Sequence, residues 1–384
     1  MGLTRRQIIG MATGAVIGAS GGRALAQVEP KPASVRSPSA SERAEITALG
    51  RDFMETYAAP ALSFAVGYAG QIVHQDAWGF ADLEGQEPAT PQHLFRIASV
   101  SKPITSITLL RLIEQGRARL TDRVFGPGAL LGTTYGQPPY NDGIDQITLE
   151  HLLTHTGGGW SNDHRDPMFT HPAMGHPDLI GWTLANRSLD RRPGEAYAYS
   201  NFGYCVLGRV IEKLTGQTYA DHVRSDVLGR CGITDMTIAG NRRDQRQPHE
   251  VQYFSQNEDA YGMNVTRMDA HGGWIARPAD LVQLFMHVDG YSRPANILQA
   301  ETIRTMTTAS TANHRYAKGW SVNGFDNWWH NGSLPGTTTI AVRTHSGFCW
   351  AAFTNTRRRA STIDGDLDRL CWNMIRKVED WRFA

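Results

Sequence analysis

The two ends of the chain carry strand patterns, whereas the long stretch between them carries mostly helical ones. Residues 62–68 alternate large apolar side chains with small ones, which predicts a strand buried mainly on one side. Ala69-Gly70 then predicts a turn into a second strand that runs towards Phe80. The far end supplies three more strand patterns, over 318–322, 338–343 and 348–354, with turn signals at Asn323-Gly324 and Ser346-Gly347. We therefore expect one antiparallel sheet built from both termini.

Helical patterns flank this sheet and fill the region between its two halves. A helix with Ser41 as its cap should precede the first strand, and a closing helix should bury the apolar positions between 367 and 378. Between them, helical patterns recur over 103–114, 149–153, 204–214 and 278–288. The chain is thus predicted to have an α+β fold. An α/β sandwich region over about 42–98 and 300–384 has its sheet flanked by helices, and an all-helical region over about 99–299 is inserted into it.

The first 26 residues have the features of a targeting segment. Arg5 and Arg6 stand just before a weakly apolar run, rich in Ala and Gly, that ends in the small-x-small pattern Ala24-Leu25-Ala26. Paired arginines before such a run resemble a twin-arginine signal peptide, so residues 1–26 predict export to the periplasm or out of the cell. The alternative is a disordered arm in which two arginines occur by chance. Residues 27–41, with three prolines and several serines, predict a linker, and the folded domain is expected over 42–384.

Charge and hydropathy exclude two classes of partner. The formal net charge of the 384 residues is +1, and it becomes −2 without residues 1–26, because that segment holds three arginines and no acid. Neither value suggests nucleic acid or an anionic membrane as a partner. No stretch approaches the ~20 apolar residues that a membrane span needs, so the mature protein is expected to be soluble.

The segment 95–103 holds the first candidate for chemistry. Ser99 and Lys102 are three residues apart at the start of a predicted helix, so their side chains should share one face. A serine hydroxyl becomes nucleophilic when a base takes its proton, and a lysine becomes a base when burial or nearby positive potential lowers its pKa. The alternative is a capping serine beside a solvated lysine. Of the five lysines in the chain, only Lys102 has a serine three residues before it.

Two further motifs could meet the first in one cleft. Tyr199 and Asn201 stand at the entrance of a predicted helix, where a phenol can shuttle a proton and an amide can hold a substrate carbonyl or the lysine. His330, Gly332 and Ser333 lead into a predicted strand. A glycine there admits the substrate close to the backbone, and the amide of Ser333 could pair with that of Ser99 as an oxyanion hole. The alternatives are that Asn201 only caps the helix, that Tyr199 only packs, and that His330 is a packed, hydrogen-bonded residue.

Taken in order, Ser99-x-x-Lys102, Tyr199-x-Asn201 and His330-x-Gly332 resemble the motifs of the serine β-lactamase and penicillin-binding protein superfamily. The resemblance is strongest to the class C β-lactamase branch, with its DD-peptidases and esterases, and it spans about residues 45–375. It implies that Ser99 is acylated and that Lys102 and Tyr199 share the acid and base work. It also implies that the amides of Ser99 and Ser333 stabilise the oxyanion, and that water then hydrolyses the acyl-enzyme.

One position departs from the lactamase pattern, which has lysine where this chain has His330. Histidine is mostly neutral at pH 7, so substrates that carry a carboxylate should bind less well, although some DD-peptidases of the family also carry histidine there. We therefore expect an esterase or amidase acting on small molecules, ahead of a DD-peptidase and then a β-lactamase. A protein that keeps the fold for binding or sensing, without turnover, is the alternative from another class.

No cofactor or metal is expected. His151 and His155 lack a third ligand, and the acids and histidines between 163 and 176 more naturally line a pocket entrance. Trp160, Phe169, Trp274 and Trp329 are candidate pocket walls, with core packing an equal alternative. The cysteines at 205, 231, 349 and 371 lack zinc-site spacing and are expected as buried thiols or at most one disulfide, whose pairing the sequence leaves open together with the oligomeric state.

Overall fold

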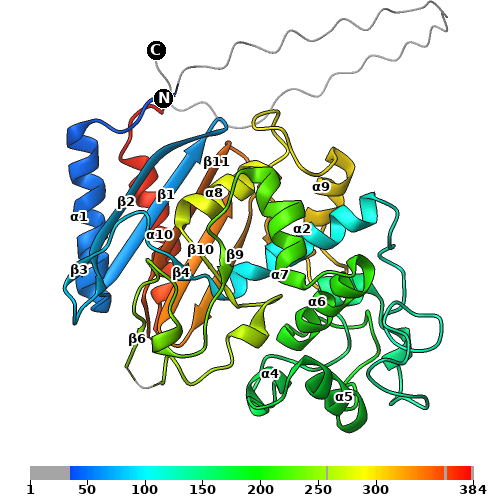
Figure 1. Cartoon of the computed structure of the whole chain (residues 1–384). Helices are drawn as coiled ribbons and strands as arrows, with labels where there is room; N and C mark the ends of the chain where they lie inside the picture. The colour runs from blue at the N-terminus through cyan, green and yellow to red at the C-terminus, as the bar shows by residue number, and fades with distance from the viewer. Residues whose placement is uncertain (1–34, 257, 359–360, 382–384) are drawn as a thin grey trace, which may run out of the picture. The chain divides into compact units, whose positions relative to one another are not determined.

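A computed structural model describes residues 35–256, 258–358 and 361–381, so the predicted signal peptide lies outside the described residues. A large antiparallel sheet lies on the left in Figure 1, beside the mainly helical region on the right. Its strands, in spatial order, are β3 (Glu87–Pro88), β2 (Gln71–Asp82), β1 (Ala61–Tyr68), β11 (Phe348–Thr354), β10 (Thr337–Arg343), β9 (Trp328–Leu334) and β8 (Ser321–Val322). β1 pairs with β11 from Leu62↔Thr354 to Tyr68↔Phe348, which joins the two ends of the chain as predicted.

Helices cover both faces of this sheet, and they bury β1 completely. α1 (Ala40–Tyr57) and α10 (Ile363–Arg376) pack together with the large apolar side chains of β1 in one cluster. α8 (Pro278–Met286) lies on the other face, against β1 and β11. All eight residues of β1 are therefore buried, where the pattern predicted burial mainly on one side. Gly67 shows why, because a Cβ there would lie 2.7 Å from the Val282 side chain, so the small residues of β1 let α8 approach closely.

The predicted helices are present, with small shifts of their ends. The cap of α1 is Ser39, whose side chain accepts the N–H of Glu42, so the prediction of Ser41 as the cap is wrong. The remaining helices are α2 (Ser101–Glu114), α3 (Leu149–Leu153), α4 (Pro167–Thr170), α5 (His176–Asn186), α6 (Asn201–Thr215), α7 (Tyr219–His222) and α9 (Ala300–Thr307). Within the described ranges, no helix combines the length and the apolar character that crossing a bilayer requires.

The region inserted between the two halves of the sheet is mainly helical and also contains short strands. β4 (Phe95–Arg96), β7 (Trp274–Ala276) and β5 (Thr237–Ile238) form a small sheet, and β6 (Phe254–Ser255) pairs with β12 (Thr356–Arg357). β4 leads through a 3-10 turn, Ala98–Val100, into α2. This turn packs against β9, so it carries Ser99 to the edge of the large sheet.

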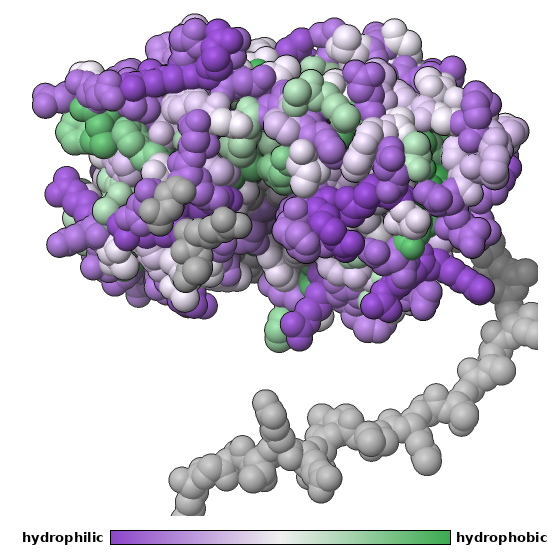
Figure 2. All heavy atoms as spheres, turned by 90° about the horizontal axis from the view of Figure 1, so that it is seen from below, coloured by the Kyte–Doolittle hydropathy of each residue, from purple (hydrophilic) through white to green (hydrophobic). Residues whose placement is uncertain are grey.

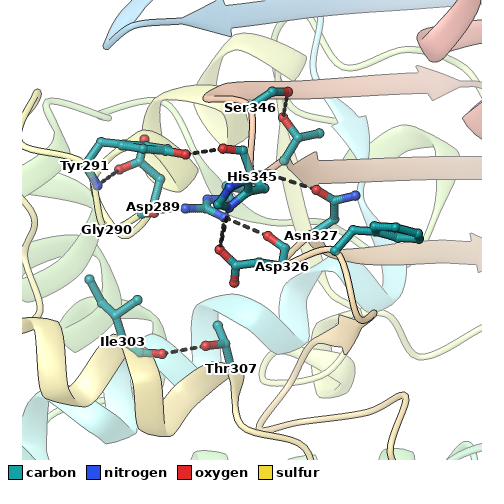
Figure 3. A network of polar contacts seen from close by, with 12 residues as sticks. Asp289, Gly290, Tyr291, Ile303, Thr307, Asp326, Asn327, His345 and Ser346 are labelled. Atoms are coloured by element: carbon teal, nitrogen blue, oxygen red, sulfur yellow. Dashed lines mark hydrogen bonds and ion pairs between the residues drawn. The ribbon is translucent and has the colours of Figure 1, made fainter. Parts of the chain in front are cut away.

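Polar contacts tie three loops together near the start of β9 (Figure 3). Asp289, which follows α8, accepts the backbone N–H of Tyr291 at 2.7 Å, and the Tyr291 hydroxyl donates to the carbonyl of His345. The His345 N–H donates to Asn327 Oδ1 at 2.8 Å, and its ring lies 3.1 Å from Asp326. This network stands at the opposite end of β9 from Ser333.

All four cysteines are buried free thiols, so the alternative of one disulfide is not realised.

Candidate active site

Ser99 lies on a strained turn and faces the amine of Lys102. Ala98 has a φ of 48°, a left-handed value that is unusual for a residue with a side chain, and such strain is often stored at functional sites. Lys102 follows on the first turn of α2 and is fully buried. Its Nζ lies 3.1 Å from Ser99 Oγ, so the two side chains meet as the three-residue spacing predicts.

Three oxygen atoms surround the amine of Lys102. Besides Ser99 Oγ, Nζ lies 2.8 Å from Asn201 Oδ1 and 3.0 Å from the carbonyl oxygen of His271. Burial lowers the pKa of Lys102 well below its usual value, and the charge of Asp166 opposes this only in part. A neutral amine has two N–H groups and one lone pair. It can donate to Asn201 and His271 while its lone pair accepts the Ser99 hydroxyl.

Tyr199 and Asn201 reach the same place from the start of α6. Ser200 caps this helix by accepting the N–H of Gly203, which fixes the two side chains on either side of it. The Tyr199 ring lies 4.7 Å from Nζ of Lys102, and its hydroxyl is hydrogen-bonded to Ser99. Burial raises the pKa of Tyr199, and the hydrogen bond with Ser99 opposes this rise only in part. The phenol therefore keeps its proton at neutral pH.

Gly332 and Ser333 bring β9 against the turn that holds Ser99. A Cβ on Gly332 would lie 2.2 Å from the carbonyl oxygen of Ile97, a contact that only glycine allows. Ser333 pairs with Thr338 one step before the two-residue turn Pro335-Gly336. In such a ladder alternate residues turn their N–H away from the partner strand, and Ser333 is one of them.

His330 lies beside this group but offers it neither a charge nor a free lone pair. Burial lowers the pKa of His330 to about 3, and nearby Lys102 adds to the effect. Its Nδ1 lies 2.7 Å from the carbonyl oxygen of Asn331 and therefore carries the proton, whereas its Nε2 lies 3.1 Å from the hydroxyl of Tyr316 and accepts from it. The Tyr316 hydroxyl in turn lies 3.1 Å from Nε2 of His155. His330 is thus held neutral by a buried chain of hydrogen bonds.

A cavity of about 630 Å³ opens beside Ser99. The surface seen from below in Figure 2 is hollowed near its middle, between the two halves of that face. The lining includes Ser99, Asn201, Phe169, His271, Ser333 and Leu334. Among the described lining residues, Arg357 is the only lysine or arginine, and its guanidinium is paired with Glu258.

Some predicted members of the site lie elsewhere. Of the four candidate pocket walls, only Phe169 lines the cavity. Trp160 and Trp274 are fully buried in the main core, and Trp329 packs against the cluster on the α1 side of the sheet. Each of these three follows the core-packing alternative.

The contacts of the site that the sequence does not predict join residues that are distant in the chain. The sequence predicts Asp166 among the acids and histidines of a pocket entrance, with a cation site as the alternative, yet Asp166 is buried and accepts a hydrogen bond from Nδ2 of Asn201 at 2.9 Å. The contacts of Tyr316 with His155 and His330 had no signal in the sequence. For Asp166 the signal was Asp166-Pro167, which is typical of a helix cap.

One group among the described residues could hold a metal ion, and it does not line the cavity. Glu87, His93 and His249 place their ligand atoms within 4.8 Å of one another. However, Nδ1 of His93 accepts the backbone N–H of Thr90 at 3.0 Å, so its Nε2 carries the proton and faces Glu87. A protonated nitrogen cannot be a ligand, so this arrangement favours a hydrogen-bonded pair.

The rings of His151 and His155, which are four residues apart, also accept hydrogen bonds from the backbone. Nδ1 of His151 accepts the N–H of Thr148, and Nδ1 of His155 accepts that of Ser200.

The chain is similar to several known proteins. Penicillin-binding protein 4* of Bacillus subtilis (strain 168) is 30% identical over 232 residues, which cover 58% of this chain and 45% of that protein, so less than half of its length is matched. A putative D-alanyl-D-alanine carboxypeptidase of Escherichia coli (strain K12) is 25% identical over 317 residues, 69% of this chain and 68% of that protein. The solved D-amino acid amidase from Ochrobactrum anthropi SV3, complexed with L-phenylalanine amide, has a TM-score of 0.72 at 20% identity and covers 88% of this chain and 99% of its own. At that identity the structural likeness shows the fold alone.

The family model described as Beta-lactamase matches residues 46–370, most of the chain. On the strength of that match, the chain belongs to the Beta-lactamase family of serine hydrolases.

Proposed function

We propose that this protein hydrolyses esters or amides of small molecules through an acyl-enzyme on Ser99. The observation that carries the proposal is the buried Lys102, whose amine has Ser99 Oγ at 3.1 Å and two carbonyl oxygens as its other partners. An amine that burial keeps neutral can act as a base. Of its three partners only Ser99 has a hydroxyl, so the lone pair accepts the proton of Ser99 Oγ.

The acylation step follows from these positions. Lys102 takes the Ser99 proton while Oγ forms a bond to the substrate carbonyl carbon, whose oxygen becomes an oxyanion. The amides of Ser99 and Ser333 stabilise that oxyanion, each by about 3 kcal/mol. The bond to the leaving group breaks as Tyr199 gives that group its phenolic proton, and the Lys102 ammonium then returns a proton to Tyr199. Water repeats the sequence on the acyl-enzyme and releases the acid.

An uncharged acyl group suits the cavity best, which favours a carboxylesterase-like activity. His330 is neutral, and Arg357 is already paired with Glu258, so a carboxylate near the scissile bond finds no spare cation among the described lining residues. Asp163 also lines the cavity and repels such a group. The names of the relatives point to DD-peptidase and D-amino acid amidase activities as the alternatives within the same chemistry.

Labelling tests the nucleophile. Intact mass after incubation with a fluorophosphonate should show one adduct on the wild type and none on Ser99→Ala. Ser101→Ala is the matched control, because Ser101 lies two residues further on, and its buried hydroxyl has no hydrogen-bond partner. An unlabelled wild type, or a labelled Ser99→Ala, would overturn the proposal and favour a binding or sensing role.

A substrate panel tests the specificity. Hydrolysis of p-nitrophenyl acetate and butyrate is compared with that of nitrocefin, D-alanyl-D-alanine peptides and a p-nitrophenyl ester with a carboxylate on its acyl chain. The kcat/KM of the neutral butyrate should exceed that of the charged ester by about tenfold or more, which corresponds to about 1.4 kcal/mol. Equal values would exclude the assigned preference.

We also propose that the protein is exported, on the strength of residues 1–26 alone. Cell fractionation followed by N-terminal sequencing should find the chain outside the cytoplasm and beginning near residue 27. A cytoplasmic chain that retains Arg5 and Arg6 would overturn this.

A further inference from the structure

Asp166 is fully buried and contacts the amide nitrogen of Asn201, whose amide oxygen faces Lys102. It is the cap of α4, and its Oδ1 accepts the N–H of Met168 at 2.9 Å. Its other oxygen, Oδ2, accepts a hydrogen bond from Nδ2 of Asn201 at 2.9 Å. A helix cap uses one oxygen, and a serine or asparagine would serve as well. The second oxygen and the complete burial therefore call for another explanation.

The carboxylate of Asp166 decides which way the Asn201 amide points. An ionised carboxylate only accepts hydrogen bonds, so it holds the NH₂ end of the amide. The carbonyl end is then turned to Lys102, with Oδ1 at 2.8 Å from Nζ. With the amide reversed, an NH₂ group would face the amine and claim its lone pair.

The orientation of that amide in turn directs the lone pair of Lys102. A neutral amine that donates to Asn201 Oδ1 and to the His271 carbonyl has its lone pair left for Ser99. We propose that Asp166 is a positioning residue, which orients Asn201 so that the lone pair of Lys102 faces Ser99. The inference rests on the proposed function, since it assigns Lys102 the role of base.

Several charged or titratable groups act on this carboxyl. The charges of Lys102 and Asp163 shift the pKa of Asp166. The charge of Asp166 in turn shifts the pKa values of Arg267, Cys205 and Tyr199. Burial raises the pKa of Asp166 to about 6, against the hydrogen bonds from Asn201 and Met168. The carboxylate is therefore mostly ionised at pH 8, where the test is made.

The test replaces Asp166 by its isostere. Asp166→Asn keeps the cap but turns the second oxygen into an NH₂ group, which requires the Asn201 amide to reverse. We expect kcat to fall about 100-fold, the lower range for loss of a general base, with KM within about threefold and the melting temperature not reduced. Asp178→Asn, which removes an exposed carboxylate from the first turn of α5, is the control and should retain wild-type rates.

A double variant separates positioning from folding. In Asp166→Asn/Asn201→Asp the new asparagine can donate to the new carboxylate, which accepts from Lys102. The amine is oriented again, but a carboxylate now adjoins it and raises its pKa. Activity should therefore return at alkaline pH, with its rising limb shifted upward by about one unit or more. Loss of stability in both variants without this shift would mean a structural role and overturn the inference, as would a kcat for Asp166→Asn within threefold of wild type.

One readout is independent of turnover. The chain has five lysines, so ¹³C labelling at Cε allows Lys102 to be titrated by NMR. Its pKa should fall in Asp166→Asn, which loses a nearby negative charge, and rise in the double variant. Unchanged values would refute the coupling itself. If the values shift as expected while the wild type is not acylated at Ser99, the proposed function fails and the positioning of Lys102 stands.

Discussion

Substitution of Gly332 by alanine should separate the two halves of the proposed oxyanion hole, which are the amides of Ser99 and Ser333. The added Cβ would lie 2.2 Å from the carbonyl oxygen of Ile97 and 2.3 Å from Oγ1 of Thr339. Ordinary contacts between carbon and oxygen begin near about 3.3 Å, so β9 and the turn at Ala98 must separate by about 1 Å. Ser333 moves with β9, and Ser99 stays with the turn.

A displacement of this size is costly for catalysis and moderate for folding. Misplacing a catalytic group by about 1 Å costs on the order of 100-fold in rate, and losing one oxyanion donor costs about 3 kcal/mol of transition-state stabilisation. Overpacking of this kind lowers the free energy of unfolding by about 1–3 kcal/mol. We therefore expect Gly332→Ala to fold and to lose about 100-fold or more in kcat.

The assay is steady-state hydrolysis of p-nitrophenyl acetate, with unfolding in urea measured on the same samples. Gly324→Ala is the matched control, because a Cβ there meets nothing within 4 Å. It should retain wild-type kcat and stability. A folded Gly332→Ala with kcat within threefold of wild type would refute the reasoning, since the amide of Ser333 would then be dispensable.

Three further predictions concern protons and buried polar groups. Because burial lowers the pKa of Lys102, the proposed base, hydrolysis should reach its plateau well below pH 10.5. A rate that is still rising with pH at 10.5 would contradict this. Tyr316→Phe leaves a buried donor on His155 and a buried acceptor on His330 without their partner. The free energy of unfolding, measured in urea, should therefore fall by about 1–3 kcal/mol. An unchanged unfolding midpoint would be evidence against this chain of hydrogen bonds. Burial raises the pKa of Asp289 to about 6, so the contribution of this carboxyl to stability is present below about pH 4 and is lost as the pH rises through 6. Asp289→Asn should therefore be more stable than the wild type at pH 8, by up to about 3 kcal/mol, but not at pH 4. A variant that is less stable than the wild type at pH 8 would disprove this.

Local spacing was enough to predict that the side chains of Ser99 and Lys102 meet. Ser99 and Lys102 share a helical face whatever the rest of the chain does, and the entrance of α6 brings Tyr199 and Asn201 to one end of one element. The two-ended sheet was predictable for a similar reason, because alternation and turn signals are local.

Long-range packing decided what the sequence could not. Asp166 is 35 residues from Asn201, and the loop that carries it has no periodicity, so only the folded chain brings the two together. In β1 the alternation of large and small residues predicts burial mainly on the side of the large ones, which does not include Gly67. Gly67 is buried because α8, more than 200 residues further along the chain, packs on the other side. Trp160 was ambiguous because large aromatic side chains serve cores and pocket walls equally well.

The four buried free thiols can be used to follow local unfolding of the protein. Cys205 lies on α6 in the inserted region, and Cys349 and Cys371 lie on β11 and α10 in the sheet region. A buried thiol reacts with an alkylating reagent only when its surroundings open, so the labelling rate at each position reports the opening of its own part of the molecule. Mass spectrometry of labelled peptides would then show whether the sheet and the inserted region unfold together or one before the other, without introducing a single mutation.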